Sequence, residues 1–260
     1  MLFRSLVGVQ GAMALDPVRV SFIKHAWDFY RPIGWHSNDA LVVIDTATAQ
    51  YEEALLWCQQ QYSTKLGTAD LLQEFQHVLF HNNAPYHAKR NLRLMCDSVY
   101  GKLSRDQHEE LYERHVLQGV GISAHNATTY TCPLYASLIS LAATVQEALA
   151  GRRLLCFSYG SGCAASMYGI RVQQLPRYPE EVLHRLNDRT IKSVDETLQL
   201  VQMFESVYRS FPYHPVHAED RLPGVYYLEC VDRLGVRGYT HRSCDTMLRV
   251  TVAGVVQLEL

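Results

Sequence analysis

The sequence predicts an α/β fold, because short apolar or alternating stretches typical of strands are interleaved with long helical patterns. Residues 131–172 show this succession most clearly, as an amphipathic helix, a short apolar strand, a Gly-Ser-Gly turn and a second strand. The 260 residues, of which 48% are hydrophobic, suffice to bury a full core in one or two domains.

The N-terminal residues permit two interpretations. Leu6–Val9 is typical of a β-strand followed by a glycine-containing turn. The same region also carries Arg4, an apolar stretch and an A-x-A-like ending at Ala12–Ala14, which are features of a targeting peptide. We favour the strand.

The next segments predict a helix followed by a short strand. Residues 38–63 show a helical pattern in which Leu55 and Tyr62 lie on the apolar side. The apolar stretch Val78–Phe80 predicts a strand that ends at His81.

Two further helices are predicted after His81. Pro85 can begin a helix, since proline lacks only an N–H group that would be unpaired in the first turn. This helix is expected to reach Tyr100, with Lys89 and Arg90 on a basic face. Residues 105–118 predict a charged, exposed helix.

The segment 131–150 predicts a helix with one buried face. Leucine and valine recur along it at spacings of three and four residues, which places them on one stripe. The members of this stripe are Leu134, Leu138, Leu141, Val145 and Leu149. Strands are expected at 154–158 and 163–171, on either side of the glycine turn.

The C-terminal part predicts one helix and two strands. Val194, Leu198 and Val201 mark the helix, and Val225–Val231 and Val236–His241 are alternating strands. The remaining tail is apolar and β-prone, without a pairing partner that the sequence identifies.

Composition excludes several classes of protein. The formal net charge is −2 and the basic residues are scattered, so we expect no nucleic-acid-binding or membrane-binding face. The seven cysteines include no C-x-x-C pair and no Cys/His cluster, so we expect no metal site. An odd number of thiols fits a reducing compartment, and we expect the cytoplasm. No apolar stretch reaches the roughly 18 residues that a membrane span needs.

Several blocks of sequence together resemble one known family. They are H-A-W-D-F-Y-R-P (His25–Pro32), V-L-F-H (Val78–His81), Y-T-C-P-L-Y-A-S-L (Tyr130–Leu138), L-A-G-R-R-L-L-C-F-S-Y-G-S-G (Leu149–Gly162) and L-P-G-V-Y-Y-L-E-C-V-D (Leu222–Asp232). In this order and spacing they resemble the C-terminal half of 3-hydroxy-3-methylglutaryl-CoA synthase. The resemblance covers roughly residues 5–242, which favours the N-terminal strand over a targeting peptide.

This resemblance implies a thiolase-like fold, of which the chain is the C-terminal half of the layered αβαβα arrangement. Residues 1–15 are then expected to be a remnant of the N-terminal half, comprising its last strand and turn. Residues 16–242 are expected to be the C-terminal domain and residues 243–260 a divergent tail. The apolar stripe of the helix at 131–150 is expected to lie near the interface with the other half.

The resemblance also implies an activity, namely the condensation of acetyl-CoA with acetoacetyl-CoA to 3-hydroxy-3-methylglutaryl-CoA on the path to isoprenoids or ketone bodies. No cofactor beyond these substrates is implied. The family takes its nucleophilic cysteine and acid/base glutamate from the N-terminal half, and none of the seven cysteines here lies in a matching context. Acyl-CoA molecules, an N-terminal-half chain or a second copy are the expected partners.

Three interpretations of function therefore stay open. The chain is the C-terminal half of a split synthase, a non-catalytic relative that binds an acyl-CoA or a partner, or a related β-branching synthase that uses carrier-protein thioesters. A mitochondrial location is the alternative to the cytoplasm, since the family has members in both.

Some site residues follow only from the resemblance. His81 matches the family's catalytic histidine, which polarises the acetoacetyl thioester carbonyl or orients that ligand. Thr128 stands where the family has a substrate-binding asparagine, and Asn126 can either compensate or form a turn. Tyr86 replaces a CoA-contacting lysine, so Lys89 and Arg90 are either substitutes for that charge or a solvated helix face.

The turn residues Ser158, Gly160, Ser161 and Gly162 match the family without change. They form either a turn that needs φ > 0 or, in addition, a set of backbone N–H groups that face the thioester oxygen. Tyr130, Tyr135 and Tyr159 are expected to be core aromatics, and His25, Asp28 and Tyr30 to be packing residues in the wall of the site.

Overall fold

The computed structural model divides into two compact units, which we describe separately. The first unit comprises Met1–Gly34 and Asp39–Thr190, and the second comprises Trp35–Asn38 and Ile191–Leu260. The predicted strand Leu6–Val9 lies outside the described residues. The structure describes residues 11–32, 40–82, 84–126, 130–174, 179–207, 210–215, 224–242, 247–251 and 255–256.

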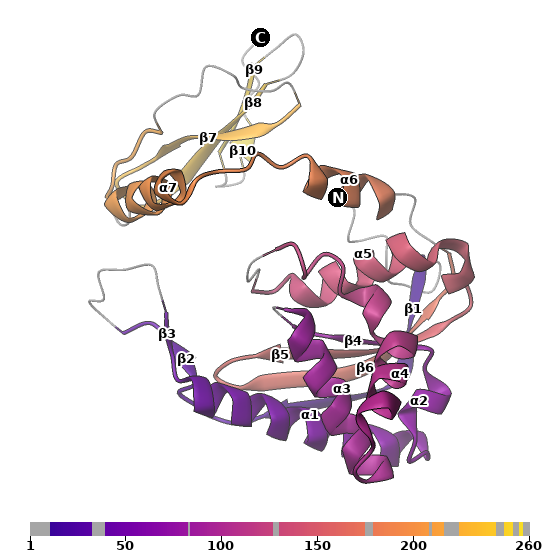
Figure 1. The fold of residues 1–260 in the computed structure, drawn as a ribbon. Coiled ribbons are helices and arrows are strands. Elements are labelled where there is room, and N and C mark those ends of the chain that lie inside the picture. Colours follow the sequence, from indigo (N-terminus) through magenta and orange to yellow (C-terminus); the bar gives the residue numbers. More distant parts are fainter. Residues whose placement is uncertain are drawn as a thin grey trace. The chain divides into compact units, whose positions relative to one another are not determined.

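A four-stranded sheet in the order β1-β6-β5-β4 organises the first unit (Figure 1). β4 and β5 are parallel, whereas β1 and β6, and β5 and β6, are antiparallel. The bounds of these strands are β1 (Met13–Ile23), β4 (His77–Phe80), β5 (Arg153–Gly160) and β6 (Ala164–Val172). The predicted α/β class and the predicted strands around the glycine turn are confirmed.

β1 (Met13–Ile23) was not predicted from the sequence. β1 continues through residue 15, so the domain boundary expected after that residue falls inside a strand. Val20 and Phe22 alternate with exposed neighbours, which is the pattern of a half-buried strand. Pro17 interrupts this pattern, and the pairing register with β6 shifts between Leu15 and Arg19.

Helices and two short strands complete the first unit. The predicted helix from Pro85 to Tyr100 is confirmed at both ends, and the one predicted at 38–63 begins later, at Ile44. The elements are β2 (Phe29–Tyr30), β3 (Leu41–Val42), α1 (Ile44–Leu66), α2 (Leu71–Glu74), α3 (Pro85–Tyr100), α4 (Arg105–His115), α5 (Pro133–Val145) and α6 (Pro179–Asn187), with 3₁₀ turns at Leu117–Gly119 and Gln146–Leu149.

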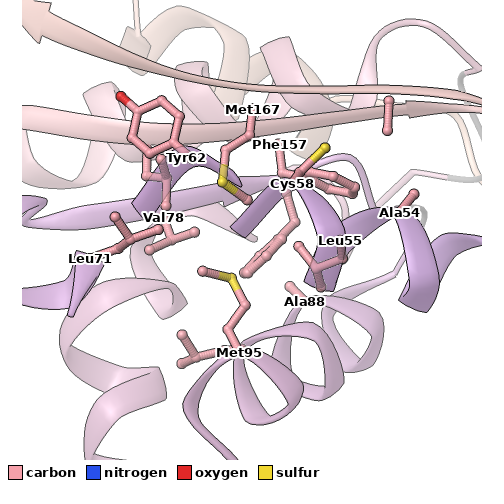
Figure 2. Close-up of a cluster of buried hydrophobic side chains, with 14 of the residues drawn as sticks. Ala54, Leu55, Cys58, Tyr62, Leu71, Val78, Ala88, Met95, Phe157 and Met167 are labelled. Atoms are coloured by element: carbon pink, nitrogen blue, oxygen red, sulfur yellow. The ribbon is translucent and has the colours of Figure 1, made fainter. Parts of the chain in front are cut away.

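One hydrophobic core fills the space between the sheet and helices α1 and α3. Figure 2 shows Phe157 and Met167 of the sheet among side chains of both helices, including Leu55 and Met95. Leu55, Phe157 and Met167 are completely buried. Burial of each such side chain contributes about 1.5–3 kcal/mol, so this core accounts for much of the unit's stability.

A second core lies on the other face of the sheet, under α5. The stripe predicted for this helix contributes Leu134, Leu141 and Leu149, which pack with Leu154 and Ile170 of the sheet. The stripe is therefore buried within the unit itself, and its expected position near the interface with the other half stays a prediction. The stripe is covered by the chain's own sheet, because β5 and β6 present apolar residues on both faces.

Helix α4 differs from the exposed helix that was predicted. Ser104 caps it in a reciprocal capping box with Gln107, which satisfies two N–H groups of the first turn. One face is buried and carries His108, Tyr112 and His115. Aromatic and imidazole side chains supply the apolar surface there, so leucine and valine periodicity did not reveal this face.

The second unit contains helix α7 and an antiparallel sheet in the order β10-β9-β8-β7. α7 (Val194–Val207), β7 (Tyr226–Val231) and β8 (Arg237–Arg242) match the predicted elements. The tail, expected to lack a partner, forms β9 (Met247–Thr251) and β10 (Val255–Val256), and β9 pairs with β8. None of the helices in the described ranges combines the length and apolar character that a bilayer span demands.

Candidate functional site

His81 follows directly after β4, at the edge of the sheet toward which the carboxyl ends of the parallel strands β4 and β5 point, and β5 itself continues to Gly160. Its N–H donates to Phe157 O at 2.8 Å, so the β4–β5 ladder continues to this residue. Its carbonyl accepts from the Tyr51 hydroxyl at 2.9 Å, and Asn91 Nδ2 donates to that hydroxyl at 3.1 Å. Helices α1 and α3 thus hold the backbone of His81 in place.

The imidazole of His81 is neutral at physiological pH. Burial lowers its pKa below the ordinary value of 6.5. A neutral imidazole has one donor and one acceptor nitrogen, so it can polarise a carbonyl as a hydrogen-bond donor.

Asn82 anchors the same strand end to helix α5. Its Nδ2 donates to Phe80 O at 2.9 Å and to Ser137 Oγ at 3.4 Å. The residue is only 3% exposed, and its Oδ1 has no hydrogen-bond partner among the residues that the structure describes. A buried acceptor without a partner is costly, so this amide is a point where a bound donor group would gain affinity.

The structure places Ser158 beside His81. Phe80 and Phe157 are partners in the parallel β4–β5 register, so the residues that follow them, His81 and Ser158, lie next to each other. The sheet therefore brings together the predicted catalytic histidine and the first residue of the predicted turn.

The turn itself requires glycine at one position. Gly162 has φ = +118°, in the region that side chains with a Cβ avoid, whereas Gly160 has no positive φ. Backbone bonds fix the turn to the segment after β1: Ala26 N donates to Gly162 O at 2.7 Å, and Cys163 N donates to Lys24 O at 2.6 Å.

Asp28 organises the turn, although the sequence analysis placed it among the packing residues. It is completely buried, and its carboxylate accepts from Tyr159 Oη at 2.8 Å and from Gly162 N at 2.9 Å. Burial raises the pKa of this carboxyl, but hydrogen bonds from Tyr159, Ser161 and Gly162 outweigh that effect and lower it below 3.8. Asp28 is thus an ionised, fully engaged anion.

These bonds limit the backbone donors that the turn can offer to a ligand. The Gly162 N–H group is committed to Asp28, and the Cys163 N–H group is committed to Lys24 O. If the turn donates a hydrogen bond to a thioester oxygen, the donor must be an N–H group of another residue of the turn.

The loop that carries Asn126 and Thr128 is described only in part. Asn126 Oδ1 accepts from Arg189 Nη1 at 3.2 Å, and the same guanidinium donates to His125 O at 2.7 Å. Thr128 lies outside the described residues. Where the chain resumes, the Tyr130 ring packs edge-to-face on Phe29, with ring centroids 6.3 Å apart.

Two of the three expected core tyrosines are not buried. Tyr130 is 58% exposed and Tyr135 is 46% exposed, so the prediction is wrong for both. Tyr159 is partly buried and packs against the first core, as expected. Tyr130 precedes α5, and Tyr135 lies in its first turn.

The basic residues proposed to contact CoA are engaged within the chain. Lys89 pairs with Glu109 and lies over the Tyr112 ring, 5.3 Å from its centroid. Arg90 pairs with Glu52. A CoA phosphate would compete with these carboxylates, although both cations are about half exposed and can reorient.

The buried thiols do not provide a nucleophile. Burial raises the pKa of Cys58 and Cys96 to about 12, and it also raises the pKa of Cys156 and Cys163. These four side chains stay protonated at neutral pH, whereas the attacking species is the thiolate. Within the described part of the chain, no group of three or more His, Cys, Asp or Glu residues could hold a metal ion.

Comparison with known families gives a match over residues 95–242 to hydroxymethylglutaryl-coenzyme A synthase, C terminal. Hydroxymethylglutaryl-CoA synthase 2 of Blattella germanica is 26% identical over 90% of this chain and 62% of its own length. The mitochondrial synthase of Sus scrofa is 29% identical over 90% of this chain and 56% of its own length. The synthase of Mycosarcoma maydis is 32% identical over 90% of this chain and 62% of its own length. The chain thus spans little more than half of each relative.

Solved structures share the fold. MvaS in complex with 3-hydroxy-3-methylglutaryl coenzyme A superposes with a TM-score of 0.71 at 22% identity, over 90% of this chain and 59% of that one. PksG, an HMG-CoA synthase from Bacillus subtilis, superposes with a TM-score of 0.74 at 17% identity, over 88% of this chain and 58% of that one. The curacin pathway HMG synthase in complex with holo donor-ACP gives 0.74 at 19% identity, over 85% and 55%. These likenesses confirm the predicted thiolase-like fold.

Proposed function

Since this chain belongs to the hydroxymethylglutaryl-CoA synthase family, whose C-terminal part it matches, we propose that it is the acyl-CoA-binding half of a synthase that condenses acetyl-CoA with acetoacetyl-CoA. The observation that carries the proposal is the position of His81 beside Ser158, where β4 ends beside β5, which leads into a turn fixed by Asp28. The product would be 3-hydroxy-3-methylglutaryl-CoA.

In this proposal His81 binds the acyl group that is attacked. Its neutral imidazole donates a hydrogen bond to the thioester or 3-oxo carbonyl, which makes that carbonyl more electrophilic. Asn126 and Thr128 would lie along the acyl group, and Lys89 and Arg90 near the CoA phosphates.

The condensation also needs a thiolate and a base within hydrogen-bond reach of the substrates. The buried thiols of Cys58, Cys96, Cys156 and Cys163 are unsuited to the first task. We therefore propose that an N-terminal-half chain supplies both groups, with homodimerisation as the alternative assembly. We expect no cofactor, and a cytoplasmic location with the mitochondrion as the alternative, since the Sus scrofa relative is mitochondrial.

Calorimetric titration of the chain with acetoacetyl-CoA tests the proposal. The wild type is expected to bind, and His81→Ala to bind several-fold more weakly, because the imidazole donor is lost. His214→Ala, which alters an exposed histidine in the second unit, is the matched control and should bind like the wild type. Equal binding by all three proteins would contradict the role of His81.

A second candidate is a non-catalytic acyl-thioester binder. It is favoured by the commitment of the Gly162 N–H group to Asp28 and by the internal ion pairs of Lys89 and Arg90. The two candidates differ when a separately expressed N-terminal half of a synthase is added. CoA release that requires both chains and His81 supports the synthase, whereas acetoacetyl-CoA binding without any release supports the binder.

A further inference from the structure

A row of polar side chains crosses four neighbouring strands on one face of the sheet. Ser21 of β1 pairs in register with Ser166 of β6, and Ser166 pairs with Ser158 of β5. The next position across the sheet, beside Ser158, is His81 at the end of β4. We call Ser21, Ser166, Ser158 and His81 the polar row.

The alternation of side chains places the serines of the polar row on the α5 face of the sheet. Phe80, Phe157 and Met167 are the immediate neighbours of His81, Ser158 and Ser166, and all three pack in the core beneath α1 and α3. Since successive side chains of a strand point to opposite faces, Ser158 and Ser166 belong to the other face, and His81 follows the last residue of β4 beside Ser158. The hydrogen bond between Ser21 Oγ and Ser166 Oγ, at 3.0 Å, places these two side chains on the same face.

This face becomes more accessible along the row. Residues one step further into the sheet, Cys156 and Tyr168, belong to the core covered by α5. His81, Ser158 and Ser166 are partly buried, and Ser21 is exposed. The row therefore lies where the cover of α5 gives way to more exposed side chains toward β1.

The Ser21–Ser166 pair retains hydrogen-bonding capacity. Each hydroxyl has one hydrogen and two lone pairs, and the mutual bond uses one hydrogen and one lone pair. One hydroxyl hydrogen is left to donate to a further acceptor. Because one serine already accepts from the other, the remaining donor is polarised toward an oxygen placed over the pair.

We propose that Ser166 and Ser21 are specificity-determining residues that bind a second oxygen of the acyl group, beyond the thioester carbonyl at His81. The proposal rests on the proposed function, because it assumes that an acyl thioester lies at His81. Neighbouring strands are about 4.8 Å apart, so Ser166 lies two strand spacings from His81, and side chains on one face reach toward a ligand between them. The site therefore selects oxo- or carboxyl-bearing acyl thioesters over plain fatty acyl thioesters.

Two thioesters of equal chain length test this selection. Acetoacetyl-CoA carries a second carbonyl, and butyryl-CoA has a methylene group in its place. In calorimetry on the full chain, we expect Ser166→Ala and Ser21→Ala each to raise the Kd for acetoacetyl-CoA by about 2- to 10-fold, the value of one hydrogen bond. Their Kd for butyryl-CoA should not change.

Three further variants make the test specific. Ser166→Thr keeps a hydroxyl on a residue suited to strands, so it should retain the preference for acetoacetyl-CoA. Ser98→Ala removes a hydroxyl on α3 that donates to Met95 O, and it should change neither Kd. Ser21 is exposed on an edge strand, so its variant remains informative even if Ser166→Ala does not fold.

The outcomes separate this inference from the proposed function. If both serine variants keep the wild-type ratio of the two Kd values while His81→Ala weakens binding, the polar row is structural and the proposed function stands. If the wild type binds neither thioester, both ideas are wrong. A loss of affinity for acetoacetyl-CoA alone in the serine variants supports the inference.

Discussion

The carboxylate of Asp28 accepts the N–H of Gly162 at 2.9 Å, although the two residues are 134 positions apart in the chain. The same carboxylate accepts the Tyr159 hydroxyl at 2.8 Å. One buried anion therefore fixes both the end of β5 and the residue that turns the chain into β6. The shape of the turn beside His81 depends on a side chain from the segment before β2.

Asp28→Asn is expected to lower the free energy of unfolding by about 1–3 kcal/mol at pH 7, since an amide NH₂ group replaces one of the two oxygens that accept from Tyr159 and Gly162. Urea denaturation measures this, with Asp188→Asn, an exposed aspartate, as the control. The folded pKa of Asp28 is below 3.8, so its contribution is present above that pH and is lost as the pH falls through the folded pKa. A difference between wild type and variant that persists undiminished at pH 2 would contradict this account.

The role of Asp28 in fixing the turn could not be predicted from the sequence. Its partners Tyr159 and Gly162 are distant in the chain, so no local spacing identifies it. The turn was recognised from a local signal, namely two glycines around a serine, whereas His81 was singled out because the segment Val78–His81 resembles the family. β1 was missed because Pro17 interrupts an otherwise alternating stretch.

The helices follow the same rule. Pro85 predicted the start of α3, and the apolar stripe predicted α5. Both signals come from residues that are close together in the sequence. What covers a face is decided by tertiary packing. The α5 stripe therefore could be recognised as buried, but not as packed against the chain's own β5 and β6.

His77 predicts a pH dependence of stability. Burial, together with the positive potentials of His115 and Arg152, lowers its pKa to about 4. The fold therefore prefers the neutral imidazole, so this contribution is complete above the unfolded pKa of about 6.5 and declines as the pH falls toward 4. The loss is at most about 3 kcal/mol.

Denaturation curves between pH 7 and pH 4 check this expectation. His77→Gln should be less stable than the wild type at pH 7, and its stability should depend less steeply on pH. His115 and His81 also have lowered pKa values, so some slope should remain in the variant. Parallel pH profiles for the two proteins would show that His77 does not titrate as described.

The contribution of Lys89 to CoA binding is predicted to increase when its ion-pair partner Glu109 is neutralised. Glu109→Gln removes the carboxylate that pairs with it and should tighten CoA binding by a few-fold at low salt, whereas Lys89→Ala should weaken it. Calorimetry at two salt concentrations measures both effects, with Lys192→Ala as the control. If Glu109→Gln and Lys89→Ala both bind CoA like the wild type, the basic face of α3 is a solvated surface that does not contact CoA.

Gly160 and Gly162 form a matched pair that separates the structural role of the turn from its ligand-binding role. Gly162 has φ = +118°, so Gly162→Ala should cost about 1–3 kcal/mol of stability, even though no described residue beyond its chain neighbours comes within 4 Å of the added Cβ. Gly160 has no positive φ, and an added Cβ would meet only Ala164 O, at 3.9 Å, so Gly160→Ala should leave stability within about 0.5 kcal/mol of the wild type. If an acyl thioester approaches this backbone closely, the same methyl group will obstruct it and raise the Kd for acetoacetyl-CoA. Wild-type affinity in a stable Gly160→Ala variant would show that the ligand does not approach the turn at this residue, and that glycine serves chain geometry at Gly162 alone.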